Sequence, residues 1–387
     1  MDTSRKAAIR FIVALGLISL FADVTYEGAR SVLGPFLATL GATAFVVGFV
    51  AGFGEMVGYA LRLVSGYLAD KTRSYWALTI AGYILNLAAV PLLFFASTWW
   101  MAAILIVLER TGKAIRTPSR DVMLSQGTKQ VGRGWGFGLH EAMDQTGAFI
   151  GPLVVAGVLA KSHDYHLAFA ILAIPAGLAV VTLLTARSVY PDPIQFEKKS
   201  AELKTAGLPP AFWIYITATG LLAAGFVDFP LMSYHFQKEA LISQPTIPIF
   251  YAVANGIEAI TALVFGKLFD RIGIKALIFG ALMSAASSPL VFFGGFGLAL
   301  TGMALWGAGM GAQQSLMRAA IANMVPLERR GTAYGIFNTA YGILWFAGSA
   351  IMGALYGVSL TGLAAFAVAA QLSAIPLLLF VKGKGHR

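Results

Sequence analysis

The 387-residue chain has no cysteine, and only 12% of its residues are charged. The missing cysteines exclude disulfides and thiolate metal sites. A soluble domain is typically about 25% charged, so the low charge excludes an ordinary soluble protein. Acidic residues are scarcer than basic ones, at 18 against 28. The five histidines have no paired spacing, and we therefore expect no metal site.

Hydrophobic residues make up 58% of the chain and recur in runs of 18 or more, which is typical of helices that span a bilayer. The first run follows a basic start but is interrupted by Asp23 and Glu27, with no small-residue cleavage site. It is therefore interpreted as a first transmembrane helix rather than a signal peptide. The runs predict twelve spans, near 9–38, 44–69, 75–96, 99–125, 131–160, 164–187, 210–238, 246–269, 274–294, 297–325, 330–357 and 361–381.

One long polar stretch interrupts this pattern, and it is rich in proline and charge. It predicts an N-terminal six-helix bundle over 1–187, a cytoplasmic linker over 188–208 and a C-terminal six-helix bundle over 209–387.

The lysines and arginines between the spans predict the orientation. Eighteen lie on the side of the termini and two on the other side. Because positively charged loops stay inside, we expect both termini in the cytoplasm and a multi-pass protein of the inner membrane. Anionic lipid beside these loops explains the net charge of +10 without a nucleic-acid partner.

Three pairs of strings predict an internal repeat. GYLADKTR at 66–73 matches GKLFDRIG at 266–273, and GRGWGFGLHEAMDQTG at 132–147 matches RRGTAYGIFNTAYG at 329–342. FADVTYEGAR at 21–30 aligns with FVDFPLMSYH at 226–235, which pairs Asp23 with Asp228 and Arg30 with His235. Parallel six-helix repeats are typical of transporters that bind substrate between the halves.

These strings, together with RTGKAIRTPSRD at 110–121 and the glycines Gly138, Gly147 and Gly151 before Pro152, resemble the major facilitator superfamily over almost the whole chain. Within it they are similar to proton-coupled drug antiporters and to a largely uncharacterised prokaryotic group. The resemblance implies an all-α membrane protein of twelve transmembrane helices in two six-helix bundles, which works by alternating access.

Ionisable groups inside a span cost about 2.5–3.5 kcal/mol each, so they usually face a wet cavity or one another. Asp23, Glu27 and Arg30 share one face of the first span. Repulsion and burial favour keeping a proton on one of the two acids, as a proton-coupled carrier requires. A purely structural, self-neutralising cluster is the alternative. The residues predicted to couple protons are Asp23, Glu27, Asp144 and Asp228.

The other embedded charges predict a substrate cavity and a cytoplasmic gate. Structural ion pairs remain an alternative for several of them, such as Glu55 with Arg62, and Glu141 with the cations of the fourth span. The predicted cavity residues are Arg30, Arg110, Glu55, His140, Glu141, Glu258 and His235. The predicted gate residues are Asp70, Arg116, Arg120, Asp121, Asp270 and Arg318.

The charged stretch LERTGKAIRTPSRD at 108–121 supplies most of the cations. Arg110, Lys113, Arg116 and Arg120 fall within about a third of a helix circumference, so they face the bundle interior. We expect Arg110 to reach the cavity beside Asp23 and Glu27. By depth, we expect Arg116 and Arg120 to lie nearer the cytoplasm.

These patterns predict a secondary active transporter that exports a small organic compound in exchange for protons. A proton symporter or uniporter for an organic anion, bound by Arg30, His235 and Arg110, is the alternative. No nucleophile–base set appears, so we expect no enzyme activity and no cofactor. The only partners expected are a small-molecule substrate, protons and the lipid bilayer, and the protein is expected to be a monomer.

Overall fold

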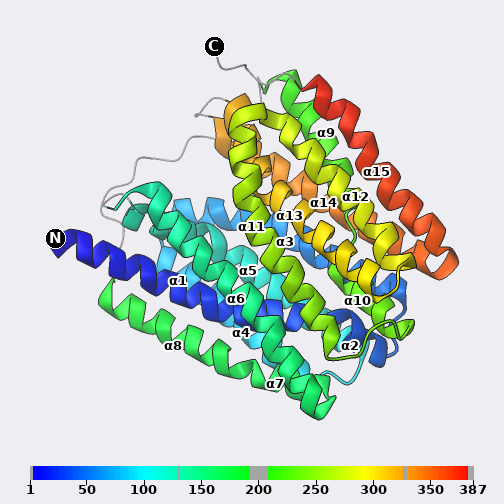
Figure 1. The fold of residues 1–387 in the computed structure, drawn as a ribbon. Coiled ribbons are helices and arrows are strands. Elements are labelled where there is room, and N and C mark those ends of the chain that lie inside the picture. Colours follow the sequence, from blue (N-terminus) through cyan, green and yellow to red (C-terminus); the bar gives the residue numbers. More distant parts are fainter. Residues whose placement is uncertain (1–2, 129–130, 192–207, 326–328, 382–387) are drawn as a thin grey trace. The chain divides into compact units, whose positions relative to one another are not determined.

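The computed structural model describes residues 3–128, 131–191, 208–325 and 329–381 (Figure 1). Throughout these residues the regular structure is helical, without a strand. The longer α-helices are α1 (Thr3–Arg30), α3 (Ala44–Thr72), α4 (Tyr75–Leu92), α5 (Trp99–Thr128), α6 (Arg133–Ser162), α8 (Ala173–Val189), α9 (Pro210–Gly225), α11 (Thr246–Ile272), α12 (Ala276–Phe293), α13 (Phe296–Met324), α14 (Arg330–Val358) and α15 (Leu360–Phe380). The shorter ones are α2 (Leu33–Thr39), α7 (Tyr165–Ile171), α10 (Phe229–Lys238) and the 3₁₀ turns η1 (Leu93–Phe95) and η2 (Gly273–Lys275).

These helices match the twelve predicted spans within a few residues, and the predicted all-α class is confirmed. Spans one, six and seven each consist of two helices in sequence: α1 with α2, α7 with α8, and α9 with α10. Within the described residues, nine stretches are long and apolar enough to cross a membrane. Helix α5 is not among them, and it contains the charged stretch at 108–121.

Local chemistry explains several helix ends. Asp164 begins α7 by accepting a hydrogen bond from the His166 backbone N–H at 2.8 Å, and Ser359 begins α15 by accepting one from Gly362 at 3.0 Å. Gly273 ends α11 with a φ of 63°, a left-handed conformation that glycine adopts without strain.

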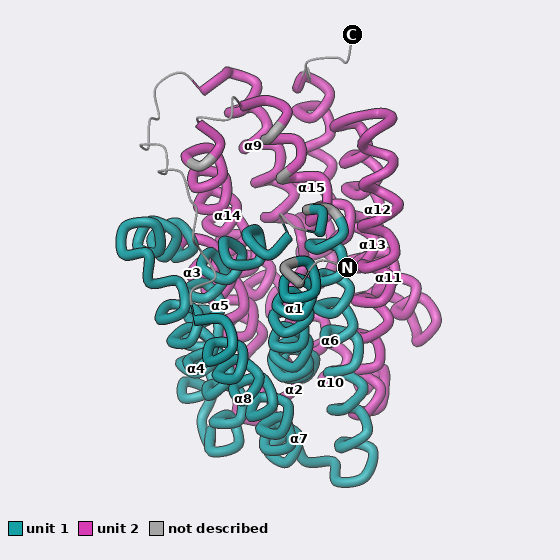
Figure 2. Tube along the Cα trace, turned by 90° about the vertical axis from the view of Figure 1, so that its left-hand side faces the viewer, with its two compact units in different colours: residues 1–32, 61–200 teal, residues 33–60, 201–387 magenta. Residues whose placement is uncertain are grey.

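The chain divides into two compact units (Figure 2). One comprises residues 1–32 and 61–200, and the other comprises 33–60 and 201–387. The segment 33–60, from the predicted first bundle, is thus grouped with the C-terminal residues. Residues 192–207 of the predicted linker lie outside the described residues, so the predicted bundle boundaries stay a prediction.

In the first unit, α1 packs against α6, α8 and α5, and α4 packs against α5. The charged helix α5 therefore shares neighbours with α1, which places its cations among the acids of α1.

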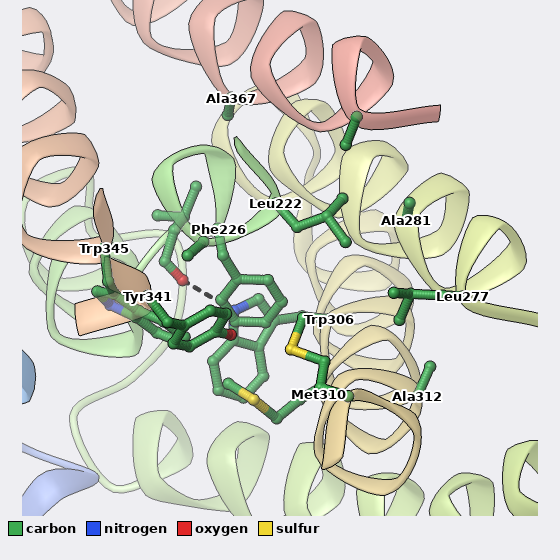
Figure 3. Close-up of a cluster of buried hydrophobic side chains, with 14 of the residues drawn as sticks. Leu222, Phe226, Leu277, Ala281, Trp306, Met310, Ala312, Tyr341, Trp345 and Ala367 are labelled. Carbon is green, nitrogen blue, oxygen red and sulfur yellow. Dashed lines mark hydrogen bonds between the residues drawn. The ribbon is translucent and has the colours of Figure 1, made fainter. Parts of the chain in front are cut away.

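In the second unit, α9 packs against α14 and α15, and α13 packs against α11 and α12. Helix α2 packs against α10, where the backbone of Gly34 comes so close to Pro230 that a Cβ would collide with the Pro230 carbonyl. The aromatic core of this unit includes Phe226, Trp306, Tyr341 and Trp345 (Figure 3).

Candidate functional site

Asp23 on α1 and Asp144 on α6 form a pair of hydrogen-bonded carboxyl groups, here called the acid pair. Asp23 is buried, Asp144 is half-buried, and Oδ1 of each is enclosed without a hydrogen-bond partner. A hydrogen bond between two carboxyl groups requires a proton on one of them, because two carboxylates have only acceptors. The acid pair therefore has the chemistry of a site that holds one proton.

Glycines of α6 bring the two aspartates together. A Cβ at Gly147 would collide with the Leu20 carbonyl and crowd Asp23, and a Cβ at Gly151 would collide with the Val24 carbonyl. The glycine spacing that resembles proton-coupled antiporters therefore lets α6 approach α1 beside Asp23.

Glu27, one turn beyond Asp23 on α1, is held by two cations. The Lys113 ammonium lies 3.8 Å from Glu27 Oε1, and an Arg30 nitrogen lies 4.0 Å from the same atom. Lys113 also lies 4.0 Å from the centre of the Tyr26 ring. The contact of Glu27 with Arg30 agrees with their predicted shared face. Lys113 was not among the predicted site residues.

Arg110 has a partner in its own helix. Its Nε lies 3.3 Å from Glu109 Oε2, while the Asn86 amide donates to Glu109 Oε1 at 2.7 Å and to the Glu109 carbonyl at 3.0 Å. Arg110 was predicted to lie beside Asp23 and Glu27, and Lys113, three residues further along α5, is a cation that contacts Glu27.

Arg120 lies in a polar link between four helices. It donates to Asp121 Oδ1 at 2.8 and 3.0 Å and to Ser19 Oγ at 3.1 Å. Ser19 also lies 3.1 Å from His140 Nε2 and 3.4 Å from the Tyr83 hydroxyl. The predicted gate residue Arg120 and the predicted cavity residue His140 thus share Ser19, which lies one helical turn before Asp23 on α1.

Arg116 is completely buried against two tyrosines. Its guanidinium lies 4.2 Å from the centre of the Tyr83 ring and 5.7 Å from that of Tyr26. Its ring contacts are thus with tyrosines of α1 and α4, whereas Asp70, the predicted gate partner, is exposed.

In the second unit, Asp228 lies where the chain breaks between α9 and α10. Trp345 donates to Asp228 Oδ1 at 2.8 Å, and the Ser349 hydroxyl donates to Oδ2. The carbonyls freed by the break are also satisfied: Trp306 donates to Val227 at 2.8 Å and Gln371 to Gly225 at 2.9 Å. The predicted proton-coupling residue Asp228 is therefore part of a helix break held by side-chain hydrogen bonds from α13, α14 and α15.

The other predicted residues lie in varied surroundings. Buried Glu258 accepts a hydrogen bond from Gln314 at 2.7 Å, and buried His235 lies 3.0 Å from the Tyr356 hydroxyl. Glu141, predicted for the cavity, is exposed and accepts from Gln145 at 3.2 Å. Glu55 is half-buried, Asp270 is exposed, and the Arg318 side chain lies outside the described residues.

Sequence reasoning missed Ser19, Tyr26, Tyr83 and Lys113. The hydroxyl and aromatic side chains carry no signal in a helix of this composition, since most such residues only pack. Lys113 had a signal, its place in the cationic stripe. Among the described residues no group of histidines and acids could hold a metal ion.

Comparisons with known proteins agree with this architecture. The model of the Major Facilitator Superfamily matches residues 15–349. An uncharacterised protein of Mycobacterium tuberculosis is 40% identical over 383 residues, which cover 97% of this chain and 94% of that protein. An uncharacterised MFS-type transporter of Methanocaldococcus jannaschii is 26% identical, with 90% of this chain and 89% of that protein covered.

Two further similarities are more distant. The multidrug resistance protein MdtH of Proteus mirabilis is 26% identical over 156 residues, which cover 40% of this chain and 36% of MdtH. The crystal structure of the nucleoside transporter NupG superposes with a TM-score of 0.75 at 13% identity, covering 95% of this chain and 99% of NupG. At that identity the similarity to NupG shows the fold alone.

Proposed function

Because the chain belongs to the major facilitator superfamily, whose members are multi-pass membrane transporters of small molecules and not enzymes, we propose that it is a proton-coupled transporter of a small organic compound. The observation that carries this proposal is the acid pair of Asp23 and Asp144, which lies between α1 and α6. In it, one proton can be taken up and released within the bundle.

The surrounding cations make the acid pair sensitive to its environment. Lys113 and Arg116 act electrostatically on Asp23, and Arg120 and Arg116 act on Asp144. When the proton leaves, two adjacent carboxylates must be stabilised by these groups, and any movement that separates α1, α5 and α6 changes that balance. Alternating access supplies such a movement, so proton release is linked to the conformation of the carrier.

The first candidate for the direction of coupling is export in exchange for protons. Its support is the similarity to MdtH and the tight α1–α6 contact at Gly147 and Gly151, the glycines that resemble those of proton-coupled antiporters. This candidate includes a location in the inner membrane, cytoplasmic termini and a monomeric carrier.

The second candidate is proton symport of an organic anion. One observation favours it: the charged residues of α1, α5 and α6 around the acid pair have a surplus of positive charge while the acid pair keeps its proton. Arg30, Arg110, Lys113 and Arg120 each contact a carboxylate, whereas Arg116 contacts tyrosine rings. The anion-binding set predicted from the sequence is less suited to this role, because Arg30, Arg110 and His235 already have partners.

Proteoliposomes with trapped pyranine, a pH-sensitive dye, distinguish the two candidates. A compound that stabilises the purified protein is added outside at equal pH. Exchange makes the lumen alkaline as the compound enters, and symport makes it acidic. Asp144→Asn should abolish the pH change, because the acid pair then has no exchangeable proton, while exchange of labelled for unlabelled compound continues.

Glu239→Gln, which removes an exposed acid far along the sequence from the acid pair, is the control and should behave as wild type. Transport of the compound by the wild-type protein without any pH change would show that proton coupling is wrong. Persistence of the pH change in Asp144→Asn would show that the proton is carried elsewhere.

A further inference from the structure

Arg116 is the one α5 cation in this cluster for which the described residues provide no carboxylate partner. Its side chain is fully buried, and its Nε and Nη1 have no hydrogen-bond partner. We propose that Arg116 binds an anionic group of the transported compound. The inference rests on the proposed function, because it requires that the chain carries a small organic compound and that the acid pair holds one proton.

The first step is the charge of the cluster. Five cations, Arg30, Arg110, Lys113, Arg116 and Arg120, face five acids, Asp23, Glu27, Glu109, Asp121 and Asp144. With one proton shared by the acid pair, one positive charge is left over. A buried charge without a counter-ion is strongly unfavourable, so an anionic ligand that neutralises this charge gains much of its binding energy from it.

The second step is the geometry of the guanidinium. The guanidinium carbon lies over the Tyr83 ring, 4.2 Å from the ring centre, and it lies 5.7 Å from the centre of the Tyr26 ring. Stacking on a ring leaves the N–H groups at the edge of the plane free to donate. An arginine held in this way has N–H donors available at the edge of its plane for the oxygens of a carboxylate, sulfonate or phosphate.

The third step is the rigidity of the support. The backbones of α4 and α5 are in close contact at Gly82 and Gly112, where a Cβ on Gly82 would collide with the backbone of Arg116 itself. Tyr83 follows Gly82 directly, so the ring and the arginine that stacks on it are fixed relative to each other. The donors are therefore pre-organised, which lowers the entropy lost when a ligand binds.

The fourth step is the ligand class. The N–H donors of Arg116 fit a carboxylate, sulfonate or phosphate group, and an aromatic sulfonate is a probe with this chemistry. Arg116 also acts electrostatically on Asp23 and Asp144. A bound anion would cancel this effect and favour the proton on the acid pair, so anion and proton would bind together. The inference thus favours the second candidate, symport.

The test uses three probes with one ring system: naphthalene-2-sulfonate, naphthalene-2-sulfonamide and 2-naphthylmethyl-trimethylammonium. Their binding to the purified full-length protein in a neutral detergent is measured by ligand-dependent thermal stabilisation and by titration calorimetry. We expect the sulfonate to bind at least ten-fold more tightly than the neutral amide and the cation. Arg116→Gln should remove this preference, and Arg116→Lys should retain part of it.

Stability without ligand gives a second readout. Arg116→Gln should leave the unfolding temperature unchanged or raise it, because an unpaired buried charge is removed. Arg120→Gln, which leaves Asp121 without its partner, should lower the unfolding temperature. A strong loss of stability in Arg116→Gln would overturn the inference and make Arg116 a structural cation.

Equal affinity for the three probes would also overturn the inference, as would an unchanged sulfonate preference in Arg116→Gln. Stabilisation by phosphatidylglycerol but not by naphthalene-2-sulfonate would assign the anionic group to a lipid instead of a transported compound. None of these outcomes bears on proton coupling, which the pyranine experiment with Asp144→Asn tests separately.

Discussion

The ammonium of Lys113 lies 3.8 Å from the carboxylate of Glu27, which joins α5 to α1 in the centre of the first unit. Glu27 is also within 4.0 Å of Arg30, so one acid serves two cations, whereas Lys113 serves one acid. Removal of Glu27 therefore affects two cations, whereas removal of Lys113 affects one acid that keeps a second cation.

Glu27→Gln should destabilise the protein by about 1–3 kcal/mol, because it removes the acid that two half-buried cations share. Lys113→Met should cost less, since Glu27 keeps Arg30. The double variant should be more stable than Glu27→Gln alone. Thermal unfolding of the detergent-solubilised protein measures all three, and additive losses in the double variant would show that the pair is not coupled.

The acid pair predicts a spectroscopic signal. A protonated carboxyl group has a C=O stretching band that a carboxylate lacks, so infrared spectra at neutral pH should show one such band for the pair. Asp23→Asn and Asp144→Asn should each remove it, because the remaining acid ionises next to an amide that donates a hydrogen bond. Glu239→Gln should leave the band in place; a band that survives both aspartate substitutions would belong to another acid.

The α1–α6 contact predicts different effects for the same substitution at two glycines of α6. Gly147→Ala should destabilise the protein by about 1–3 kcal/mol, because the added Cβ collides with the Leu20 carbonyl and crowds Asp23. Gly138→Ala should be neutral or stabilising, since the space around Gly138 is open and alanine favours the helix. Similar unfolding temperatures for the two variants would argue against close packing at Gly147.

The helix break at Asp228 depends on donors from α14. Trp345→Phe keeps an aromatic ring but removes the N–H that reaches Asp228 Oδ1, and should cost about 1.5–3 kcal/mol. Trp213→Phe is the matched control, because Trp213 is 49% exposed. Thermal unfolding compares them, and an equal, small effect of both would mean that Asp228 does not need the indole.

The proposed orientation can be tested by labelling, since the chain has no native cysteine. Ser74→Cys, in the exposed turn before α4, should be shielded from an impermeant thiol reagent in intact cells. Ser162→Cys, at the end of α6, should react. Labelling of Ser74→Cys from outside, with Ser162→Cys shielded, would reverse the orientation.

Membrane class, helix positions and the family were already determined by the sequence. Hydropathy is a local property, and about twenty apolar residues in a row leave a chain in lipid little choice but a helix. The sequence alone also predicted the concentration of charge in the first half and the glycine spacing of α6. It predicted the shared face of Glu27 and Arg30 as well, because spacing along one helix fixes which side chains are neighbours.

Only the tertiary structure decided which charges on different helices meet. The spacing of Arg110, Lys113, Arg116 and Arg120 predicts a common face, but the rotation of α5 against α1 selects Lys113 for Glu27. A long arginine side chain can also reach several ångströms along the helix axis, so depth in the sequence does not fix where the Arg116 guanidinium lies. Asp144 met Asp23 only through the packing of α6 on α1.

The internal repeat also has one part that the sequence predicts and one part that only the tertiary structure decides. The sequence aligns Asp23 with Asp228, yet α1 continues through Asp23 while α9 ends at Gly225. A helix can end inside a bundle only where other helices satisfy its free carbonyls. Gln371 on α15 and Trp306 on α13 do so at Gly225 and Val227, more than seventy residues along the chain. Helix packing brings those donors to the break, and a local sequence pattern does not predict which distant residues pack there.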